Sequence, residues 1–488
     1  MATWYVKTAA EGGSDSAAGT SEAVAFATLQ KAHDSASAND TVYVKAGTYT
    51  ATVSGTKNLT VIGYGSGQVL FYGATTVGGD AWTVHSGSVW KKTNVSALAA
   101  GLTVGIYTIS TLSALVFRTA AGGFVKGWQM DSIGEIDSVS TYGIKFWWDD
   151  AANTLYAYSA TNPNTAFTSV DYTSNTGTAG TVALTSGGIV WTGATLTMRN
   201  VDVYGWDGNG VLIYNGSADI ANCDISFNRE DGYGGHRGTN PAIRRSKMRF
   251  NGVRRARDSA AFTDVLPDGD GHSWHAHAGT QTTGIIDEFN YYEGNTKDAF
   301  QHIDASTGTC VGAVIKNCNF NIVYNQSGTQ TLYSARITAG ANDVSGIAFL
   351  NTGTVNIYGS TLYGAGTASV PAFAVALGPP ANLRGCAIKN WAVGYSGSVP
   401  TTESHNGWNV TSVGLTPAGT SFTTTFTLLG ADLGIARTSA CFGTGVAISG
   451  LNFDGAGKAR PTTPSVGAME PYRTGSTSGA GGVVTWLD

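Results

Sequence analysis

The chain has 488 residues and a formal net charge of −5 at neutral pH, and only 12% of its residues are charged. This charge provides no overall attraction to nucleic acid or to an anionic membrane, so neither is an expected partner. No stretch approaches the length of about 18 apolar residues that a transmembrane helix needs. Glycine is abundant, with 66 residues, which indicates many tight turns between short elements.

The N-terminal part, residues 1–79, is predicted to form a cap and the first turns of a repeating fold. Residues 21–37 have the pattern of an amphipathic helix that would cover the open end of the first turn, and strands are expected at 41–44, 59–62 and 69–72. Residues 1–6 show neither a basic nor an apolar leader segment. We therefore expect either a secreted protein whose leader was removed or a protein exported by another route, such as cell lysis.

Residues 80–170 interrupt the pattern and are predicted to form a β insertion. This stretch is rich in tryptophan, and residues 146–158 have the pattern of a hairpin. Two interpretations remain open: the aromatic residues build a small core of their own, or they form a wall on which sugar rings stack.

Residues 171–395 contain a repeated pattern of two inward apolar positions separated by one outward position. The predicted inward pairs are Val201/Val203, Cys223/Ile225, Ser246/Met248, Phe289/Tyr291, Cys318/Phe320, Ser360/Leu362 and Cys386/Ile388. Their spacing indicates a unit of about 21 to 29 residues, with one unseen unit in each of the two longer gaps. Short strands at such a period predict a parallel β-helix, in which each rung buries its inner face against its neighbours.

Two further features depend on this register. Asn228, Asn251 and Asn295 follow their inward positions by five or six residues and are expected to stack at one corner. The cysteines at 223, 318 and 386 occupy inward positions, so they are expected to be free, buried thiols rather than disulfide partners. Residues 396–488 are predicted to form an irregular β region with a flexible tail after Tyr472.

Several segments resemble a known family. Trp4–Val6, residues 26–30 and residues 40–49 resemble the N-terminal cap of right-handed parallel β-helix proteins of the pectate-lyase-like superfamily, and residues 453–470 resemble a segment that often closes such helices. Residues 155–163 resemble an insertion found in some members. The resemblance implies an all-β, right-handed, single-stranded parallel β-helix. The superfamily includes polysaccharide lyases, hydrolases, epimerases, phage tailspike-like depolymerases and non-catalytic adhesins, so the resemblance is weak for activity.

The charged residues are unevenly distributed. Residues 228–302 hold 20 of the 61 charged residues and five of the eight histidines, which makes this region the predicted site. The segment Gly269–His275 also resembles one seen in related β-helix proteins. The expected catalytic residues are Asp270, His275 and Arg254, with Asp231 and Asp298 as second choices. The expected substrate-binding residues are Arg237, Arg249, Arg257, His272, Trp274, His277, Tyr292 and Glu293.

These residue types suit two reactions on a polysaccharide. β-Elimination needs a cation that neutralises the uronate carboxylate and a base at C5, whereas hydrolysis needs two carboxyl groups about 5 to 9.5 Å apart. The sequence leaves this choice open. It also leaves open that the acids lie in solvated turns and that the arginines form ordinary surface ion pairs.

The predicted function is binding and cleavage of an extended, possibly acidic, polysaccharide in a lateral groove, by a lyase or a glycoside hydrolase. A phage tailspike or depolymerase, in a homotrimer, would suit an extracellular or virion location. The alternatives are a non-catalytic adhesin or structural spike, and a secreted pectinase-like lyase. No cofactor is expected, with calcium as a weaker alternative, because the candidate ligands do not match a known metal-binding spacing.

Overall fold

The structure is a computed structural model, and the fold below is that of its described residues. These are 1–95, 102–104, 107–109, 114–130, 132–137, 143–149, 151–173, 187–252, 269–275, 282–296, 298–302, 307–318, 321–324, 328–339, 345–349, 353–364, 373–377, 381–398, 400–421, 423, 425–426, 428–429, 433–436, 438–449 and 451–468. They divide into two compact units. Unit 1 falls within Met1–Gly235, Lys247–Ser273 and Gly294–Lys297, and unit 2 within His236–Ser246, Trp274–Glu293 and Asp298–Asp488.

The N-terminal cap contains one short α-helix, α1 (Leu29–Ser35), which buries Leu29, Ala32 and His33. The predicted helix over residues 21–37 is therefore too long. Glu22–Val24 form a separate 3-10 turn, and Ala25 is extended. The backbone amide of Phe26 then donates to Tyr5, which places residues 25–28 beside strand β1 (Thr3–Val6) before Thr28 caps the helix.

Unit 1 contains parallel strands in three columns. β2 (Asp40–Tyr49), the first part of β4 (Leu59–Tyr72), β16 (Thr195–Arg199) and β19 (Ser217–Ala221) form the first column. The end of β4, β17 (Asp202–Tyr204), β20 (Asp224–Ser226) and β23 (Lys247–Arg249) form the second. β3 (Val53–Gly55), β15 (Gly187–Thr192) and β18 (Asn209–Tyr214) form the third. The boundary between the units falls within β21 (Tyr233–His236) and β24 (His272–His275).

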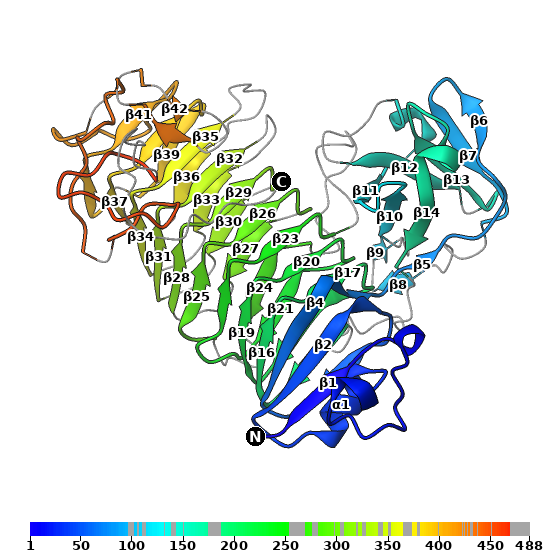
Figure 1. Ribbon diagram of the computed structural model, residues 1–488. Helices are drawn as coiled ribbons and strands as arrows, with labels where there is room; N and C mark the ends of the chain where they lie inside the picture. Colours follow the sequence, from blue (N-terminus) through cyan, green and yellow to red (C-terminus); the bar gives the residue numbers. More distant parts are fainter. Residues whose placement is uncertain are drawn as a thin grey trace. The chain divides into compact units, whose positions relative to one another are not determined.

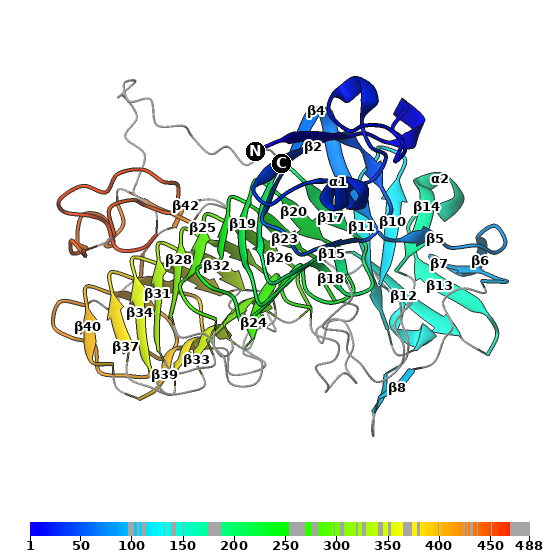
Figure 2. The same cartoon turned by 90° about the horizontal axis from the view of Figure 1, so that it is seen from below.

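Unit 2 repeats the same three columns (Figures 1 and 2). The first column is β22 (Ala242–Arg244), β25 (Ile285–Glu288), β28 (Thr307–Val311), β31 (Thr329–Tyr333), β34 (Thr354–Tyr358), β37 (Ala381–Arg384) and β40 (Thr402–Ser404). The second is β26 (Tyr291–Glu293), β29 (Val314–Lys316), β32 (Arg336–Ala339), β35 (Thr361–Gly364), β38 (Ala387–Lys389) and β41 (Gly407–Asn409). The third is β27 (Asp298–His302), β30 (Asn321–Tyr324), β33 (Ser345–Phe349), β36 (Phe373–Leu377) and β39 (Val393–Gly397). The predicted parallel β-helix is therefore confirmed.

Most of the predicted register is confirmed. Five of the seven predicted inward pairs are buried: Val201/Val203, Cys223/Ile225, Ser246/Met248, Ser360/Leu362 and Cys386/Ile388. The pair Phe289/Tyr291 is wrong by one residue, because Asn290 and Tyr292 are the fully buried positions. Asn290 can lie inside because its amide donates to the carbonyl of Ile243 (2.8 Å) and its Oδ1 accepts from the amide of Ser246 (2.9 Å).

The predicted rung count also needs correction. β22 pairs directly with β25, so no rung was skipped between Ser246 and residue 289; the additional residues 253–268 and 276–281 lie outside the described residues. The inward pair of the next rung is Ala313/Ile315, and Cys318 lies in the turn after it. The unseen rung predicted between Cys318 and Ser360 is confirmed at Ala335/Ile337, while Phe320 lies outside the described residues.

The predicted asparagine corner is confirmed in unit 1. The Oδ1 of Asn251 accepts from the backbone amide and the side-chain amide of Asn228, both at 3.1 Å. Asn295 accepts in the same way from Asn251, at 3.1 and 3.0 Å. With Asn290 as the inward residue of its rung, each ladder asparagine follows its inward position by five residues. All three are fully buried, so this ladder holds the rungs in register.

The C-terminal segment, residues 451–468, lies against the side of the rungs in unit 2. The backbone amide of Gly467 donates to Gly385, and that of Ala468 donates to the Thr361 hydroxyl. A Cβ on Gly359, which has a φ of 53°, would lie 2.6 Å from a Leu451 methyl group. Small residues at these bends therefore leave room for the segment.

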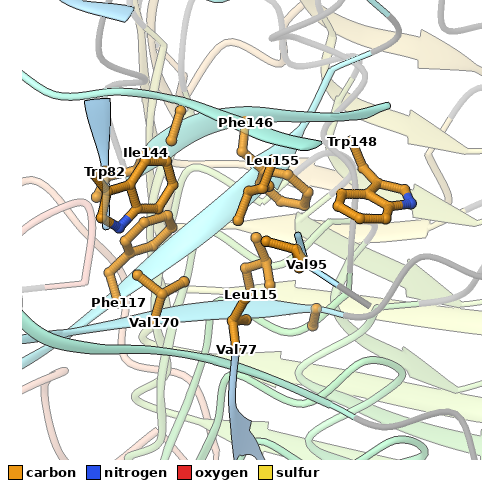
Figure 3. Packing of buried hydrophobic residues seen from close by; sticks show 12 residues of the cluster. Val77, Trp82, Val95, Leu115, Phe117, Ile144, Phe146, Trp148, Leu155 and Val170 are labelled. Carbon is orange, nitrogen blue, oxygen red and sulfur yellow. The ribbon is translucent and has the colours of Figure 1, made fainter. Parts of the chain in front are cut away.

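The predicted β insertion is an eight-stranded sheet in unit 1. Its strands are β5 (Thr75–Thr76), β6 (Thr83–Ser86), β7 (Val89–Lys92), β10 (Leu115–Thr119), β11 (Phe124–Gln129), β12 (Ile144–Asp149), β13 (Thr154–Tyr158) and β14 (Phe167–Tyr172). The hairpin is confirmed, since β12 and β13 pair antiparallel with Trp148 opposite Leu155. Trp82, Phe117, Phe146 and Trp148 are buried in one cluster (Figure 3), so these aromatic residues form a core of their own.

All five cysteines are free and buried. Burial raises the pKa of the Cys223 and Cys386 thiols to about 12, which disfavours the reactive thiolate. The prediction of buried thiols is confirmed for Cys223, Cys318 and Cys386.

Candidate functional site

Two aspartates stack on the outer face of the second strand column of unit 1. In β17 and β20 the central residues, Val203 and Ile225, point inward, so the residues before them point outward. Asp202 lies directly opposite Asp224 in the parallel ladder. Because neighbouring strands lie about 4.8 Å apart, the two carboxyl groups are neighbours on one face.

Polar side chains on both sides complete what we call the outer carboxylate row: Gln68, Asp202, Asp224 and Arg249. The amide of Gln68 donates to Asp202 Oδ2 (2.7 Å), and the backbone amide of Asp224 donates to Asp202 Oδ1 (3.0 Å). Arg249 Nη2 donates to Asp224 Oδ2 (2.5 Å) in an ion pair. The hydroxyl of Ser226 donates to the other Asp224 oxygen.

The two aspartates have different electrostatic surroundings. Burial and, to a smaller extent, the negative charge of Asp224 together raise the pKa of Asp202 to about 6, while the hydrogen bond from Gln68 acts in the opposite direction. Asp224 has the guanidinium of Arg249 as its direct partner. Near pH 6 the row can therefore hold a protonated carboxylic acid beside a charged carboxylate, which is the arrangement that acid–base catalysis requires.

Aromatic residues lie next to this row. Tyr204, the other outward residue of β17, has its ring 5.3 Å from Phe227 and 5.3 Å from Phe124 of the insertion. Phe250 stacks on Phe227 at 5.5 Å. Phe227 and Phe250 have φ values of 62° and 56°, which bulky residues rarely adopt. The equivalent turn positions Gly205, Gly294, Asn317 and Asn390 also have positive φ values, so this conformation belongs to the repeat.

The predicted acids Asp231 and Asp270 do lie together in unit 1. Asp231 Oδ1 accepts from the backbone amide of Asp270 (2.9 Å), and its Oδ2 accepts from the hydroxyl of Ser273 (2.5 Å). Both aspartates are buried, Asp270 fully. Asp298, in unit 2, is also fully buried and accepts from the amide of Gln301 (3.3 Å). Their catalytic roles stay predictions.

The predicted substrate-binding residues have different surroundings. Arg249 belongs to the outer carboxylate row, and Arg237 is half-buried at a turn with a φ of 55°. Glu293 accepts from the Tyr291 hydroxyl (3.0 Å), whereas His272 and Trp274 are fully buried. Arg254, Arg257 and His277 lie outside the described residues, as does the side chain of His275.

Tyr292 lies inside the β-helix rather than on its outer face. Its hydroxyl donates to Asp287 Oδ2 (2.7 Å), and the Asn290 amide donates to Asp287 Oδ1 (2.5 Å). Asp287 occupies an inward column between Ile243 and Cys310, and burial raises its pKa to about 7. This carboxyl group is fully buried, so it is not available to a ligand.

Sequence reasoning identified Asp202 and Asp224 as outward residues but not as a site. The density of charge at 228–302 directed attention to a later part of the chain. A signal was present: two aspartates occupy the same outward position of consecutive rungs, where like charges repel each other. Such an arrangement costs stability and is therefore a stronger indication of function than charge density.

Within the described parts of the chain, no group of three His, Cys, Asp or Glu side chains is placed to hold a metal ion. The expectation of no cofactor, with calcium as the alternative, stays a prediction. Among the same residues, no helix has the length and apolarity to span a membrane.

Comparison with known proteins supports the fold. Residues 187–362 match the family described as "Right handed beta helix region". The predicted right-handed parallel β-helix is thereby confirmed, and with it, at the level of fold, the resemblance to the pectate-lyase-like superfamily. No curated protein sequence matches the chain.

Solved structures with some likeness include XylC in complex with xylose, with 10% identity, a TM-score of 0.48, and coverage of 96% of this chain and 98% of that one. Pectate lyase Pel9A has 13% identity, a TM-score of 0.45 and 97% coverage of both chains. The tailspike protein gp49 from Pseudomonas phage LKA1 has 12% identity and a TM-score of 0.23, with 79% of this chain and 71% of that one covered. Scores and identities this low do not identify an activity.

Proposed function

We propose that this right-handed parallel β-helix protein binds an extended polysaccharide along the outer face of unit 1 and hydrolyses it at Asp202 and Asp224. The observation that carries the proposal is the pairing of two outward carboxyl groups on adjacent rungs, one of which has its pKa raised to about 6. Hydrolysis of a glycosidic bond needs one carboxyl group as proton donor and a second as nucleophile or base.

The roles follow from the surroundings of each group. Asp202, half protonated near pH 6, would donate a proton to the glycosidic oxygen. Asp224, charged and ion-paired with Arg249, would attack the sugar or activate water. The strand spacing of about 4.8 Å is close to the separation of about 5 to 5.5 Å that retaining glycosidases use.

A second candidate function is polysaccharide binding without cleavage, by an adhesin or a structural spike. It is favoured by the hydrogen bonds within the row, because Gln68, Ser226 and Arg249 already occupy oxygens of both aspartates. For both candidate functions we propose an extracellular or virion location and a homotrimer. Analytical ultracentrifugation of the purified chain tests the trimer.

The test is incubation of the protein with a panel of capsular, exopolysaccharide and plant-wall polysaccharides. Hydrolysis releases reducing ends without absorbance near 235 nm, whereas β-elimination produces that absorbance. Asp219→Asn is the matched control for Asp202→Asn, because Asp219 forms an outward pair with Arg199 (2.5 Å) in the first strand column of the same unit. Binding without any cleavage would support the adhesin, and absorbance near 235 nm would replace hydrolysis with elimination.

A further inference from the structure

Arg118 lies beside two aromatic rings in unit 1 that also contact each other, with ring centres 5.8 Å apart. This residue lies on β10 of the insertion, and its guanidinium carbon is 5.6 Å from the ring centre of Tyr72 and 5.5 Å from that of Phe124. The side chain is half-buried, so part of it remains accessible. Two aromatic faces hold the cation in place without using its hydrogen-bond donors.

No carboxylate of the described chain pairs with Arg118. Other arginines on strands do have such partners: Arg199 pairs with Asp219, Arg249 with Asp224 and Arg244 with Glu288. The nearest acid in the strand ladder is Asp171 on β14, which lies opposite Val116 of β10. Its two oxygens already accept from the Tyr72 hydroxyl (2.6 Å) and the Thr76 hydroxyl (3.0 Å).

A continuous series of contacts connects Arg118 to the outer carboxylate row. Phe124 contacts Tyr204, with ring centres 5.3 Å apart. The Tyr204 hydroxyl lies 3.5 Å from the Gln68 amide nitrogen, which donates to Asp202. Arg118 is thus linked to the row through Phe124, Tyr204 and Gln68, and it lies on the side of the row that faces the insertion.

We propose that Arg118 binds the carboxylate of an acidic sugar unit in the polymer that the outer carboxylate row holds. The inference rests on the proposed polysaccharide function and adds the substrate class: an acidic polysaccharide that contains uronate or a similar carboxylate sugar. The planar guanidinium offers paired donors that match a carboxylate.

Electrostatic balance supports this assignment. Asp202 and Asp224 would repel a negatively charged sugar, and Arg249 offsets only part of that charge because it is already paired with Asp224. Arg118 supplies an additional positive charge, and among the described residues no acceptor occupies its donors. Because cation–π contacts with Tyr72 and Phe124 restrict its side chain, less entropy is lost when a ligand binds.

The experiment compares binding of the wild-type chain, Arg118→Ala and Arg118→Lys to an array of acidic and neutral glycans. Arg199→Ala is the control, since it removes an outward arginine elsewhere in the unit. The best acidic binder is then tested again after chemical reduction of its carboxylates to alcohols. Thermal melting of each variant identifies loss of folding, and Arg118→Gln replaces the alanine variant if that one melts early.

The expected result is that acidic glycans bind, that Arg118→Ala weakens their binding at least about tenfold, and that Arg118→Lys weakens it less. Carboxyl reduction should remove the difference between wild type and Arg118→Ala. The inference is overturned if Arg118→Ala binds acidic glycans with the same affinity as the wild type. It is also overturned if Arg118→Ala still binds more weakly than the wild type after the carboxylates of the polymer are reduced. Binding of neutral glycans alone, unaffected at Arg118, would overturn the inference and leave the proposed function intact, whereas no glycan binding at all would overturn both.

Discussion

The outer face of unit 1 and the interior of unit 2 each contain an aspartate whose pKa is raised by burial, to about 6 at Asp202 and about 7 at Asp287. Asp202 points outward beside a second carboxyl group and is half-buried. Asp287 lies inside, with Tyr292 and Asn290 as its donors. A raised pKa therefore indicates catalysis at the outer face of unit 1 and a structural role in the interior of unit 2. Only the direction of the side chain distinguishes the two cases.

The interior aspartate is the residue whose loss should cost most stability. Asp287→Ala leaves the Tyr292 hydroxyl and the Asn290 amide without their acceptor and creates a small cavity. We expect a loss of about 3 to 5 kcal/mol in the free energy of unfolding, measured by urea denaturation. The matched surface substitution, Asp219→Ala, should change the free energy of unfolding by no more than about ±0.5 kcal/mol. Equal small effects at both positions would remove the proposed difference between interior and outer face.

The pH dependence of stability tests whether Asp287 is protonated inside unit 2. Because the folded pKa of Asp287 is raised to about 7, the native state retains a proton that the unfolded chain releases near pH 4. Stability should therefore fall as pH rises from about 4 to 7, by up to about 4 kcal/mol. Asp287→Asn should flatten this slope in urea denaturation at several pH values. An unchanged slope would mean that Asp287 is ionised in the folded protein.

A buried cation in the insertion should make stability depend on pH in the opposite direction. Lys126 is almost fully buried, its amine has no hydrogen-bond partner among the described residues, and burial lowers its pKa to about 7. The unfolded chain binds a proton that the folded chain releases, so stability should rise with pH from about 7 to 10. Lys126→Met should stabilise the protein by about 1 to 3 kcal/mol at pH 6 and by much less at pH 10. A stabilisation that is the same at both pH values would indicate a packing effect alone.

The fold was largely predictable because its register depends on repeated, simple residue choices. Pairs such as Ser246/Met248 and Cys386/Ile388 were assigned correctly, and the asparagine corner followed from spacing alone. The error at Phe289/Tyr291 arose where three aromatic residues flank one asparagine, so apolar character could not indicate which side faces inward. Asn290 is stabilised inside the β-helix by specific partners such as Asp287 on β25.

The candidate site was less predictable, because its members come from distant parts of the sequence. Gln68 reaches Asp202 across 134 residues, and the ring of Phe124 comes from the insertion. Local charge density identified Arg249 but not its partner Asp224 as a functional residue. The relation between Asp202 and Asp224 was visible only as equal register on adjacent rungs.

The most direct test of the central claim is the turnover of Asp202→Asn on the polysaccharide that the wild-type chain cleaves, with Asp219→Asn and Asp287→Asn as controls. We predict a loss of about 10²- to 10⁴-fold for Asp202→Asn without a lower melting temperature, and little change in turnover for the two controls. Wild-type activity should also decline as pH rises above about 6, because Asp202 then loses the proton it donates. Wild-type turnover by Asp202→Asn would contradict the assignment of the reaction to the outer carboxylate row.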